Sequence, residues 1–249
     1  MFNYVTQNTH SYRYEAMYGR LKKIAELAHE KKVRLMIDAE QTYFQHAIDS
    51  MVLRLQRRFN KDHCVVYNTY QCYLKDSSVR LKGDMERSAR EKFCFAAKLV
   101  RGAYMYSERE LAEEEGRESP IHDSLDDTHA SYDRNMESVL KYIRDNKNRA
   151  EVMFATHSSR SVKFAVRCMQ DWDIPRESVY FGQLLGMADN ITFPLGSSGY
   201  NVYKYVPYGP INEVMPYLIR RAQENSDLLG GVSLERDMLF KELKSRFAA

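Results

Sequence analysis

Two adjacent arginines near the C-terminus are the residue types that point most directly to ligand binding. Arg220 and Arg221 lie in the segment YLIRRAQEN (217–225). Neighbouring guanidinium groups can grip a carboxylate through bidentate, charge-assisted hydrogen bonds. Glu224 follows Arg221 by three residues and could hold one guanidinium by an i,i+3 ion pair, and Tyr217 lies one turn earlier on the same face. The alternative is an ordinary pair of arginines on a solvated helix surface.

A second set of charged and small residues lies at the end of the apolar run in AKLVRGAY (97–104). Lys98 and Arg101 place positive charge there, and because Lys98 lies inside the run, a purely solvated pair is the weaker interpretation. Gly102 and Ala103 are small enough to let the backbone approach a bound group closely, although small residues also simply make turns.

Further polar residues follow other apolar runs. Asp38 could pair with a cation or cap the helix after it. Gln71 can both donate and accept hydrogen bonds, and Thr156 and His157 close another run. A lone histidine at such a place is more often structural than a ligand, and no metal-ligand spacing surrounds His157.

The elements that must position these residues alternate between strand and helix. Strands are predicted at 33–38, 64–70, 94–100, 152–156, 179–181 and 202–206 from short apolar runs rich in β-branched residues. Amphipathic helices are predicted at 43–59, 80–92, 124–144 and 158–171. This alternation predicts parallel strands with crossover helices, in either an open doubly wound sheet or a barrel.

The polar residues at the strand ends favour the barrel, whose chemistry gathers at the C-terminal ends of its strands. The sequence contains no G-x-G-x-x-G turn, which a dinucleotide-binding open sheet would place after its first strand. The fold class predicted is therefore α/β, a (β/α)8 barrel that is incomplete because six strands do not close an eight-stranded ring.

Composition limits the remaining classes of function. The 249 residues, 44% hydrophobic and 29% charged, fit one large domain over 1–249. A formal net charge of +3 without a long basic run does not indicate nucleic acid as a partner, and no stretch of 18 apolar residues indicates a membrane span. The four cysteines, at 64, 72, 94 and 168, are expected to be reduced core residues, and no metal is expected.

Seven segments together resemble one enzyme family. They are RLMIDAE (34–40), NTYQCYL (68–74), AKLVRGAY (97–104), FATHS (154–158), YFGQLLGM (180–187), VYKYVPYG (202–209) and YLIRRAQEN (217–225). Their order and spacing resemble those of the proline dehydrogenases, the animal-type mitochondrial branch most. The resemblance implies a distorted (β/α)8 barrel with noncovalent FAD that oxidises L-proline to Δ1-pyrroline-5-carboxylate and passes electrons to quinone. It also implies the matrix side of the mitochondrial inner membrane, with peripheral membrane association of the full-length protein.

The resemblance assigns roles to individual residues. Asp38 and Lys98 are expected to be catalytic, Lys98 by stabilising negative charge on the flavin. The residues expected to contact FAD are Ala39, Gln71, Lys98, Arg101, Gly102, Ala103, Thr156, His157 and Glu224. Those expected to bind substrate are Leu185, Tyr205, Tyr217, Arg220 and Arg221. Tyr205 is expected to leave no room for a 4-hydroxyl, since hydroxyproline dehydrogenases have a smaller residue there.

The chain also departs from the family pattern. Its six predicted strands correspond to strands three to eight of the family barrel, so the first two strands, with a lysine that contacts the substrate carboxylate, are expected to be missing. The stretch up to Glu30 is predicted to be the helix that follows the second strand. Two other functions stay open: hydroxyproline oxidation, and a noncatalytic remnant that binds a partner or the full-length enzyme.

Overall fold

The computed structural model describes residues 2–147, 149–226 and 230–247. The first part of the chain contains α1 (Phe2–Glu30), β1 (Leu35–Ile37), α2 (Thr42–Phe59), β2 (Val66–Gln71), α3 (Ser77–Glu91), β3 (Phe95–Val100), α4 (Met105–Glu114), α5 (Leu125–Asp145), β4 (Ala150–Ala155) and α6 (Ser159–Asp171). A short 3-10 helix (Arg176–Ser178), β5 (Val179–Leu184), α7 (Asp189–Ser197), β6 (Asn201–Tyr205), α8 (Ile211–Ser226) and α9 (Gly230–Phe247) follow.

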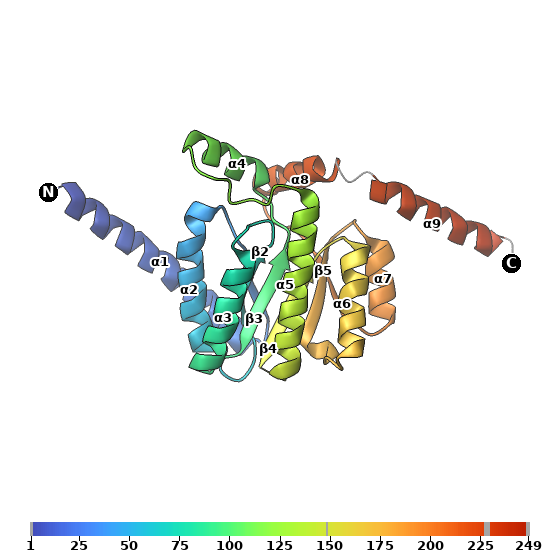
Figure 1. The fold of residues 1–249 in the computed structure, drawn as a ribbon, viewed down its shortest axis with the longest axis horizontal. Coiled ribbons are helices and arrows are strands. Elements are labelled where there is room, and N and C mark those ends of the chain that lie inside the picture. Colours follow the sequence, from blue (N-terminus) through green and yellow to red (C-terminus); the bar gives the residue numbers. More distant parts are fainter. Residues whose placement is uncertain (1, 148, 227–229, 248–249) are drawn as a thin grey trace. The chain divides into compact units, whose positions relative to one another are not determined.

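Within the described residues, six strands form one sheet in their order along the chain, from β1 to β6. The pairs β1–β2, β2–β3 and β3–β4 are parallel. Figure 1 shows α3 and α5 lying side by side against this part of the sheet. Sequential parallel strands joined by helices are the arrangement of a (β/α)8 barrel, so the predicted fold class is confirmed.

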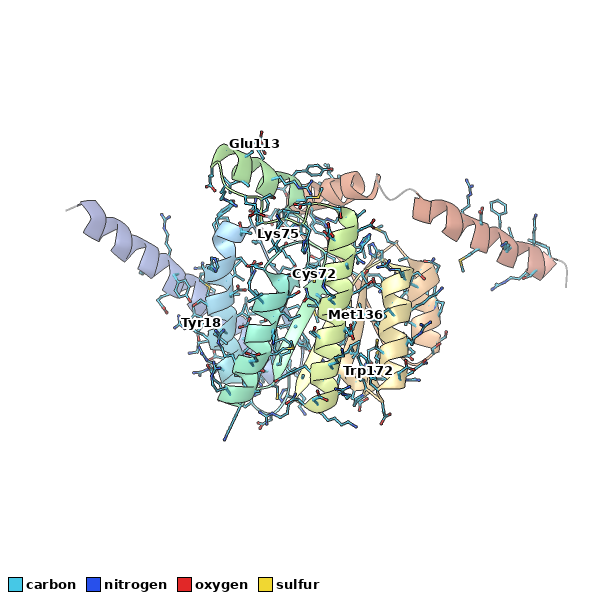
Figure 2. The ribbon with its side chains drawn as sticks, viewed as in Figure 1. Tyr18, Cys72, Lys75, Glu113, Met136 and Trp172 are labelled. Atoms are coloured by element: carbon cyan, nitrogen blue, oxygen red, sulfur yellow. The ribbon has the colours of Figure 1, made fainter. Side chains whose placement is uncertain are left out.

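The chain divides into two compact units, of which the first ends at Phe181 and the second begins at Gly182. In the first unit the strands have a helix-covered face and an inner face. Along β4, Ala150, Val152 and Phe154 are buried, whereas the residues between them are only partly buried. Strand β2 is buried along its whole length, as a strand covered on both faces should be. Figure 2 labels two buried residues of this unit, Cys72 just after β2 and Met136 on α5.

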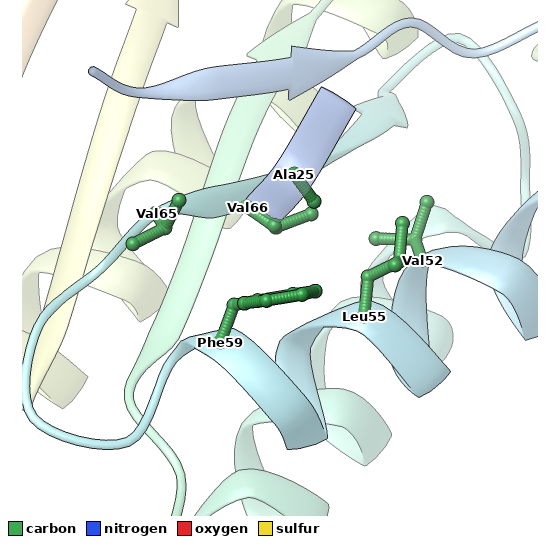
Figure 3. Packing of buried hydrophobic residues seen from close by; sticks show 6 residues of the cluster. All are labelled: Ala25, Val52, Leu55, Phe59, Val65 and Val66. Atoms are coloured by element: carbon green, nitrogen blue, oxygen red, sulfur yellow. The ribbon is translucent and has the colours of Figure 1, made fainter. Parts of the chain in front are cut away.

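One apolar cluster fixes α1 and α2 on the sheet. It consists of Ala25, Val52, Leu55, Phe59, Val65 and Val66, all buried (Figure 3). Full burial of one aliphatic or aromatic side chain of this size contributes about 1.5–3 kcal/mol. The cluster therefore anchors the C-terminal part of α1 as well as α2. Because α1 ends at Glu30, the helix predicted for the stretch up to this residue is confirmed.

All four cysteines are free and buried, which confirms their interpretation as reduced core residues. In the part of the chain that the structure describes, no helix is long and apolar enough to cross a membrane. Over the same residues, no group of three or more histidine, cysteine, aspartate or glutamate side chains is arranged to hold a metal ion.

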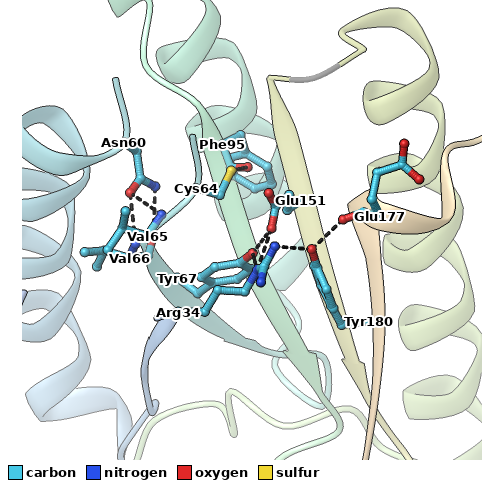
Figure 4. Close-up of polar contacts among 10 residues, drawn as sticks. All are labelled: Arg34, Asn60, Cys64, Val65, Val66, Tyr67, Phe95, Glu151, Glu177 and Tyr180. Carbon is cyan, nitrogen blue, oxygen red and sulfur yellow. Dashed lines mark hydrogen bonds and ion pairs between the residues drawn. The ribbon is translucent and has the colours of Figure 1, made fainter. Parts of the chain in front are cut away.

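A polar cluster on the inner face connects strands that are not neighbours (Figure 4). The Arg34 Nε lies 2.8 Å from Glu151 Oε2 on β4 and 3.0 Å from the hydroxyl of Tyr67 on β2. Tyr67 also donates to Glu151, and the Arg34 guanidinium donates to the hydroxyl of Tyr180 on β5 and lies 4.3 Å from its ring centroid. We call Arg34, Tyr67, Glu151 and Tyr180 the inner-face cluster.

The inner-face cluster shows that the sheet of the first unit is curved. In a flat sheet, β1 and β5 would be separated by four strand spacings, roughly 19 Å. Contact between Arg34, one residue before β1, and Tyr180 of β5 instead requires the strands to curl toward one another. Partial burial disfavours the charged form of Arg34, but the hydrogen bond to Glu151 and the nearby charges have the larger combined effect. The pKa of Arg34 is therefore raised. Burial, aided by Glu151, raises the pKa of Tyr67.

We predict that Arg34→Met and Glu151→Gln each lower the free energy of unfolding by about 1–2 kcal/mol, because each leaves the other charge without its partner. The double variant should lose less than the sum of the two, with a coupling energy of about 1 kcal/mol. Urea unfolding of the four proteins measures this. The exposed pair Arg144 and Asp145 provides the control, with an expected coupling near zero. Additive losses for Arg34 and Glu151 would show that the cluster does not hold the curvature.

Candidate functional site

The two residues predicted to be catalytic are paired with each other. Lys98 lies on the inner face of β3 with 14% of its side chain exposed, and its ammonium forms an ion pair with Asp38, one residue after β1. Asp38 is 59% exposed and so remains in contact with solvent. The alternative role of Asp38 as a helix cap is wrong, because Gln41 occupies the N-cap position of α2.

Gln71 ends β2 and holds the loop between β1 and α2. Its side chain is buried and its Nε2 donates to the carbonyl oxygen of Glu40 at 2.8 Å. The backbone N–H of Glu40 in turn donates to Gln45 Oε1 at 2.9 Å. Ala39, next to Glu40, is partly buried in this loop. The two glutamines thus fix the backbone that follows Asp38.

The Arg101 guanidinium is held by several neutral groups at the end of β3. It donates to Thr156 Oγ1 at 2.8 Å, to Ser161 Oγ at 3.0 Å and to His129 Nδ1 at 2.9 Å. It also lies 4.3 Å from the centroid of the Tyr132 ring. Among the described residues, no carboxylate forms an ion pair with Arg101, so its charge is not neutralised by a direct partner.

His129, Tyr132 and Ser161 were not predicted from the sequence. His129 and Tyr132 lie on α5 and Ser161 on α6, inside amphipathic helices whose pattern indicates packing only. No short motif marks them, because they meet Arg101 from distant parts of the chain. They become recognisable as part of the candidate site only through their contacts with Arg101.

Gly102 is required by close packing. Its φ is +133°, and a Cβ there would lie 2.4 Å from Cδ1 of the Tyr73 ring. Tyr73 is buried, and burial raises the pKa of its phenol. Any other residue at 102 would push the backbone away from this ring, whereas Ala103 beside it is exposed.

Thr156 and His157 follow β4. Thr156 is buried, and its Oγ1 accepts from the backbone N–H of Ser158 at 3.0 Å as well as from Arg101. His157 between them is partly buried. Lys98 lies within β3, and the other residues predicted to be catalytic or to contact the cofactor in this unit lie at or just beyond the ends of β1 to β4: Asp38, Ala39, Gln71, Arg101, Gly102, Ala103, Thr156 and His157.

Four predicted substrate residues lie together in the second unit. The backbone N–H of Leu185 donates to the carbonyl of Tyr205 at 3.0 Å. The Tyr205 ring lies 5.8 Å from the Tyr217 ring, and the Arg221 guanidinium lies 5.4 Å from the centroid of the Tyr217 ring. The side chains of Arg220 and Glu224 lie outside what the structure describes.

Comparison with known proteins gives the family. The sequence model of the family described as proline dehydrogenase matches residues 3–233. A human protein named "Proline dehydrogenase 1, mitochondrial" is 51% identical over 232 residues, covering 92% of this chain and 38% of the human protein. A Xenopus laevis protein named "Hydroxyproline dehydrogenase" is 41% identical over 247 residues, covering 98% of this chain and 53% of that protein.

The fold of this chain also matches a solved structure. The crystal structure of proline utilization A from Bdellovibrio bacteriovorus, inactivated by N-propargylglycine, matches with a TM-score of 0.78 and 28% identity, covering 85% of this chain and 22% of that protein. The chain spans 38% and 53% of the two relatives above, so it corresponds to part of each. Because the family model extends over most of the sequence, the chain belongs to the proline dehydrogenase family.

Proposed function

We propose that this chain carries cofactor and substrate residues of an enzyme that oxidises L-proline to Δ1-pyrroline-5-carboxylate with FAD and passes the electrons to quinone. The observation that carries the proposal is the family match over residues 3–233, within which Lys98 and Arg101 bring positive charge to the C-terminal part of β3. In a barrel of parallel strands, that end is where active sites lie.

The residues present fit an anionic, hydrogen-bonding cofactor. Among the described residues, Arg101 forms no ion pair with a carboxylate, and three of the five N–H groups of its guanidinium donate to other side chains. Two N–H groups remain for a ligand such as a diphosphate or a flavin carbonyl. FAD, when bound, supplies the acceptor for the hydride that leaves C5 of proline. Gln71, Thr156, His157 and the backbone of Ala39, Gly102 and Ala103 complete the proposed contacts, with Glu224 as a further one.

Lys98 and Asp38 have complementary parts in this proposal. Lys98 places a charge on the inner face, where it stabilises the negative charge that a flavin gains on reduction. Asp38 balances that charge in the structure, and its exposed carboxylate orders the surroundings of the substrate. The ion pair thus keeps the mostly buried ammonium in place.

The second unit supplies the substrate residues. Arg220 and Arg221 bind the carboxylate of proline, and the Tyr217 ring stabilises the Arg221 guanidinium through a cation–π contact. Tyr205 and Leu185 form an apolar wall against the proline ring. Arginine suits this role because its planar guanidinium matches the two oxygens of a carboxylate.

Hydroxyproline is the second candidate substrate. The observation in its favour is that relatives named hydroxyproline dehydrogenase, from Xenopus laevis and Bos taurus, are each 41% identical over almost the whole chain. Tyr205 argues for proline, because a tyrosine ring fills space that a 4-hydroxyl would need and offers that hydroxyl an apolar surface.

We further propose a mitochondrial location, at the matrix side of the inner membrane, with the full-length protein attached peripherally. The support is that the human, bovine and Drosophila melanogaster relatives at 44–51% identity carry the word mitochondrial in their names. Electron transfer to a membrane quinone also requires access to the membrane surface.

We predict that Lys98→Met lowers the reduction potential of the bound flavin by tens of mV, since about 30 mV corresponds to 1.4 kcal/mol for a two-electron couple. The flavin should be reduced more slowly by proline, while proline binding changes less. Potentiometry and stopped-flow absorbance measure both effects. Lys98→Arg should retain most of the potential, and the exposed Lys82→Met is the control. A potential equal to that of the unaltered protein would make Lys98 a structural residue.

We also predict that Tyr205→Ser shifts preference toward trans-4-hydroxyproline. It should lower kcat/KM for proline and raise the ratio of hydroxyproline to proline kcat/KM by about a hundredfold or less, since an apolar pocket rejects an added hydroxyl by about that factor. Tyr208→Ser, at a side chain that is 93% exposed, is the matched control and should leave the ratio unchanged. An unchanged ratio in Tyr205→Ser would remove Tyr205 as the residue that selects the substrate.

A further inference from the structure

The orientation of the Arg101 side chain depends on a histidine. Its Nε–H donates to His129 Nδ1 at 2.9 Å, while its two terminal nitrogens donate to Thr156 and Ser161. The three acceptors come from α5, the end of β4 and α6, so the guanidinium is held from three sides. Of these acceptors, only the imidazole changes its capacity to accept with pH in the physiological range.

The contact with Arg101 defines the state of His129. An imidazole nitrogen accepts a hydrogen bond only when it carries no proton, so His129 is neutral and its proton lies on Nε2. Protonation at Nδ1 turns the acceptor into a donor that faces another donor. It also places two positive charges at hydrogen-bond distance, which is strongly unfavourable in a partly buried site.

We propose that His129 is a pH-sensitive positioning residue, whose neutral imidazole holds Arg101 in place to bind the cofactor and whose protonation releases it. The inference rests on the proposed function in one respect, namely that Arg101 contacts FAD. His129 itself acts through Arg101 and is not a catalytic residue.

The surroundings of His129 favour its neutral form. Its pKa is lowered from 6.5, first by burial and then by the positive charges of Arg101 from β3 and Arg160 from α6. Asp126 and Asp133 on the same helix act in the opposite direction without reversing the shift. Because the pKa of His129 is lowered, the imidazole is neutral at pH 7, and the contact with Arg101 is lost only at a pH below the range in which an ordinary histidine becomes protonated.

Neighbouring groups confine the effect to this contact. Asp133 is engaged elsewhere, because it accepts from Ser161 Oγ at 2.8 Å and pairs with Arg160 at 2.7 Å. The Arg101 guanidinium also lies 4.3 Å from the centroid of the Tyr132 ring, and the face of this ring does not change its charge when His129 is protonated. Protonation therefore removes one of three hydrogen bonds to Arg101 and adds repulsion, without removing the other partners.

The test compares two variants of His129, one that keeps a hydrogen-bond acceptor for Arg101 that does not titrate and one that has no acceptor. In His129→Asn, the amide oxygen can accept from Arg101 at every pH, whereas His129→Leu has no acceptor. His63→Asn is the control, because His63 is exposed and precedes β2, at the opposite end of the parallel strands. The dissociation constant of FAD is measured by quenching of its fluorescence between pH 5 and 8.

We expect the dissociation constant of the unaltered chain to rise about tenfold or more as His129 is protonated, the effect of losing a hydrogen bond to a charged group. His129→Asn should show no such rise, His129→Leu should bind FAD weakly at every pH, and His63→Asn should follow the unaltered chain. An acid rise that persists in His129→Asn overturns the proposal.

A second measurement does not depend on FAD. Nitrogen-15 NMR of the ligand-free chain follows the His129 imidazole and the Arg101 Nε–H through the same titration. An Arg101 signal that shifts with the His129 titration supports the inference even if FAD does not bind, and one that stays constant overturns it. Failure of FAD to bind at any pH contradicts the proposed function instead.

Discussion

The alternation of side chains between the two faces of parallel strands is the constraint on which the candidate site depends. The inner-face cluster fixes this alternation, because Arg34, Tyr67, Glu151 and Tyr180 must all face inward to meet. A shift of one residue in any strand would reverse its faces. Ala96 pairs with Glu151 in register, so Lys98, two residues further along β3, shares the inner face with the cluster. The contacts at the beginning of the strands thus determine where the lysine near their end points.

Two positively charged side chains of the candidate site, Lys98 and Arg101, are held in different ways. Lys98 is paired with a carboxylate, so its charge is balanced within the protein. Arg101 contacts two hydroxyl groups, a neutral imidazole and an aromatic face, which orient its guanidinium, and no carboxylate in the described part of the chain forms an ion pair with it. A cation oriented by neutral groups keeps its attraction for an external anion. This difference makes Arg101 the better candidate to hold a charged part of the cofactor and Lys98 the better candidate to tune its electron affinity.

Much of the fold follows from local sequence patterns, and much of the site does not. The six strands and the long amphipathic helices could be predicted because their apolar residues repeat at the strand or helix period. The strand predicted at 179–181 extends to Leu184 in β5, and Gln183 lies buried within it as a single polar residue. Helix α4 was missed because its sequence, MYSERELAEE, has too few apolar residues to show a clear stripe.

The partners of Arg101 could not be predicted from local sequence patterns. His129, Thr156 and Ser161 are 28, 55 and 60 residues away along the chain, so no local spacing connects them to Arg101. Resemblance identified Thr156, whereas His129 and Ser161 required the folded structure. The assignment of the site residues to flavin and substrate stays a prediction.

Whether the candidate site oxidises proline can be tested by adding L-proline anaerobically to the purified chain after loading with FAD and following the flavin absorbance. We expect the chain to retain stoichiometric FAD and proline to bleach the oxidised flavin, whereas trans-4-hydroxyproline should do so much less efficiently. Retained FAD that proline does not reduce, or a chain that binds no FAD, would show that these residues do not form a working proline-oxidising site.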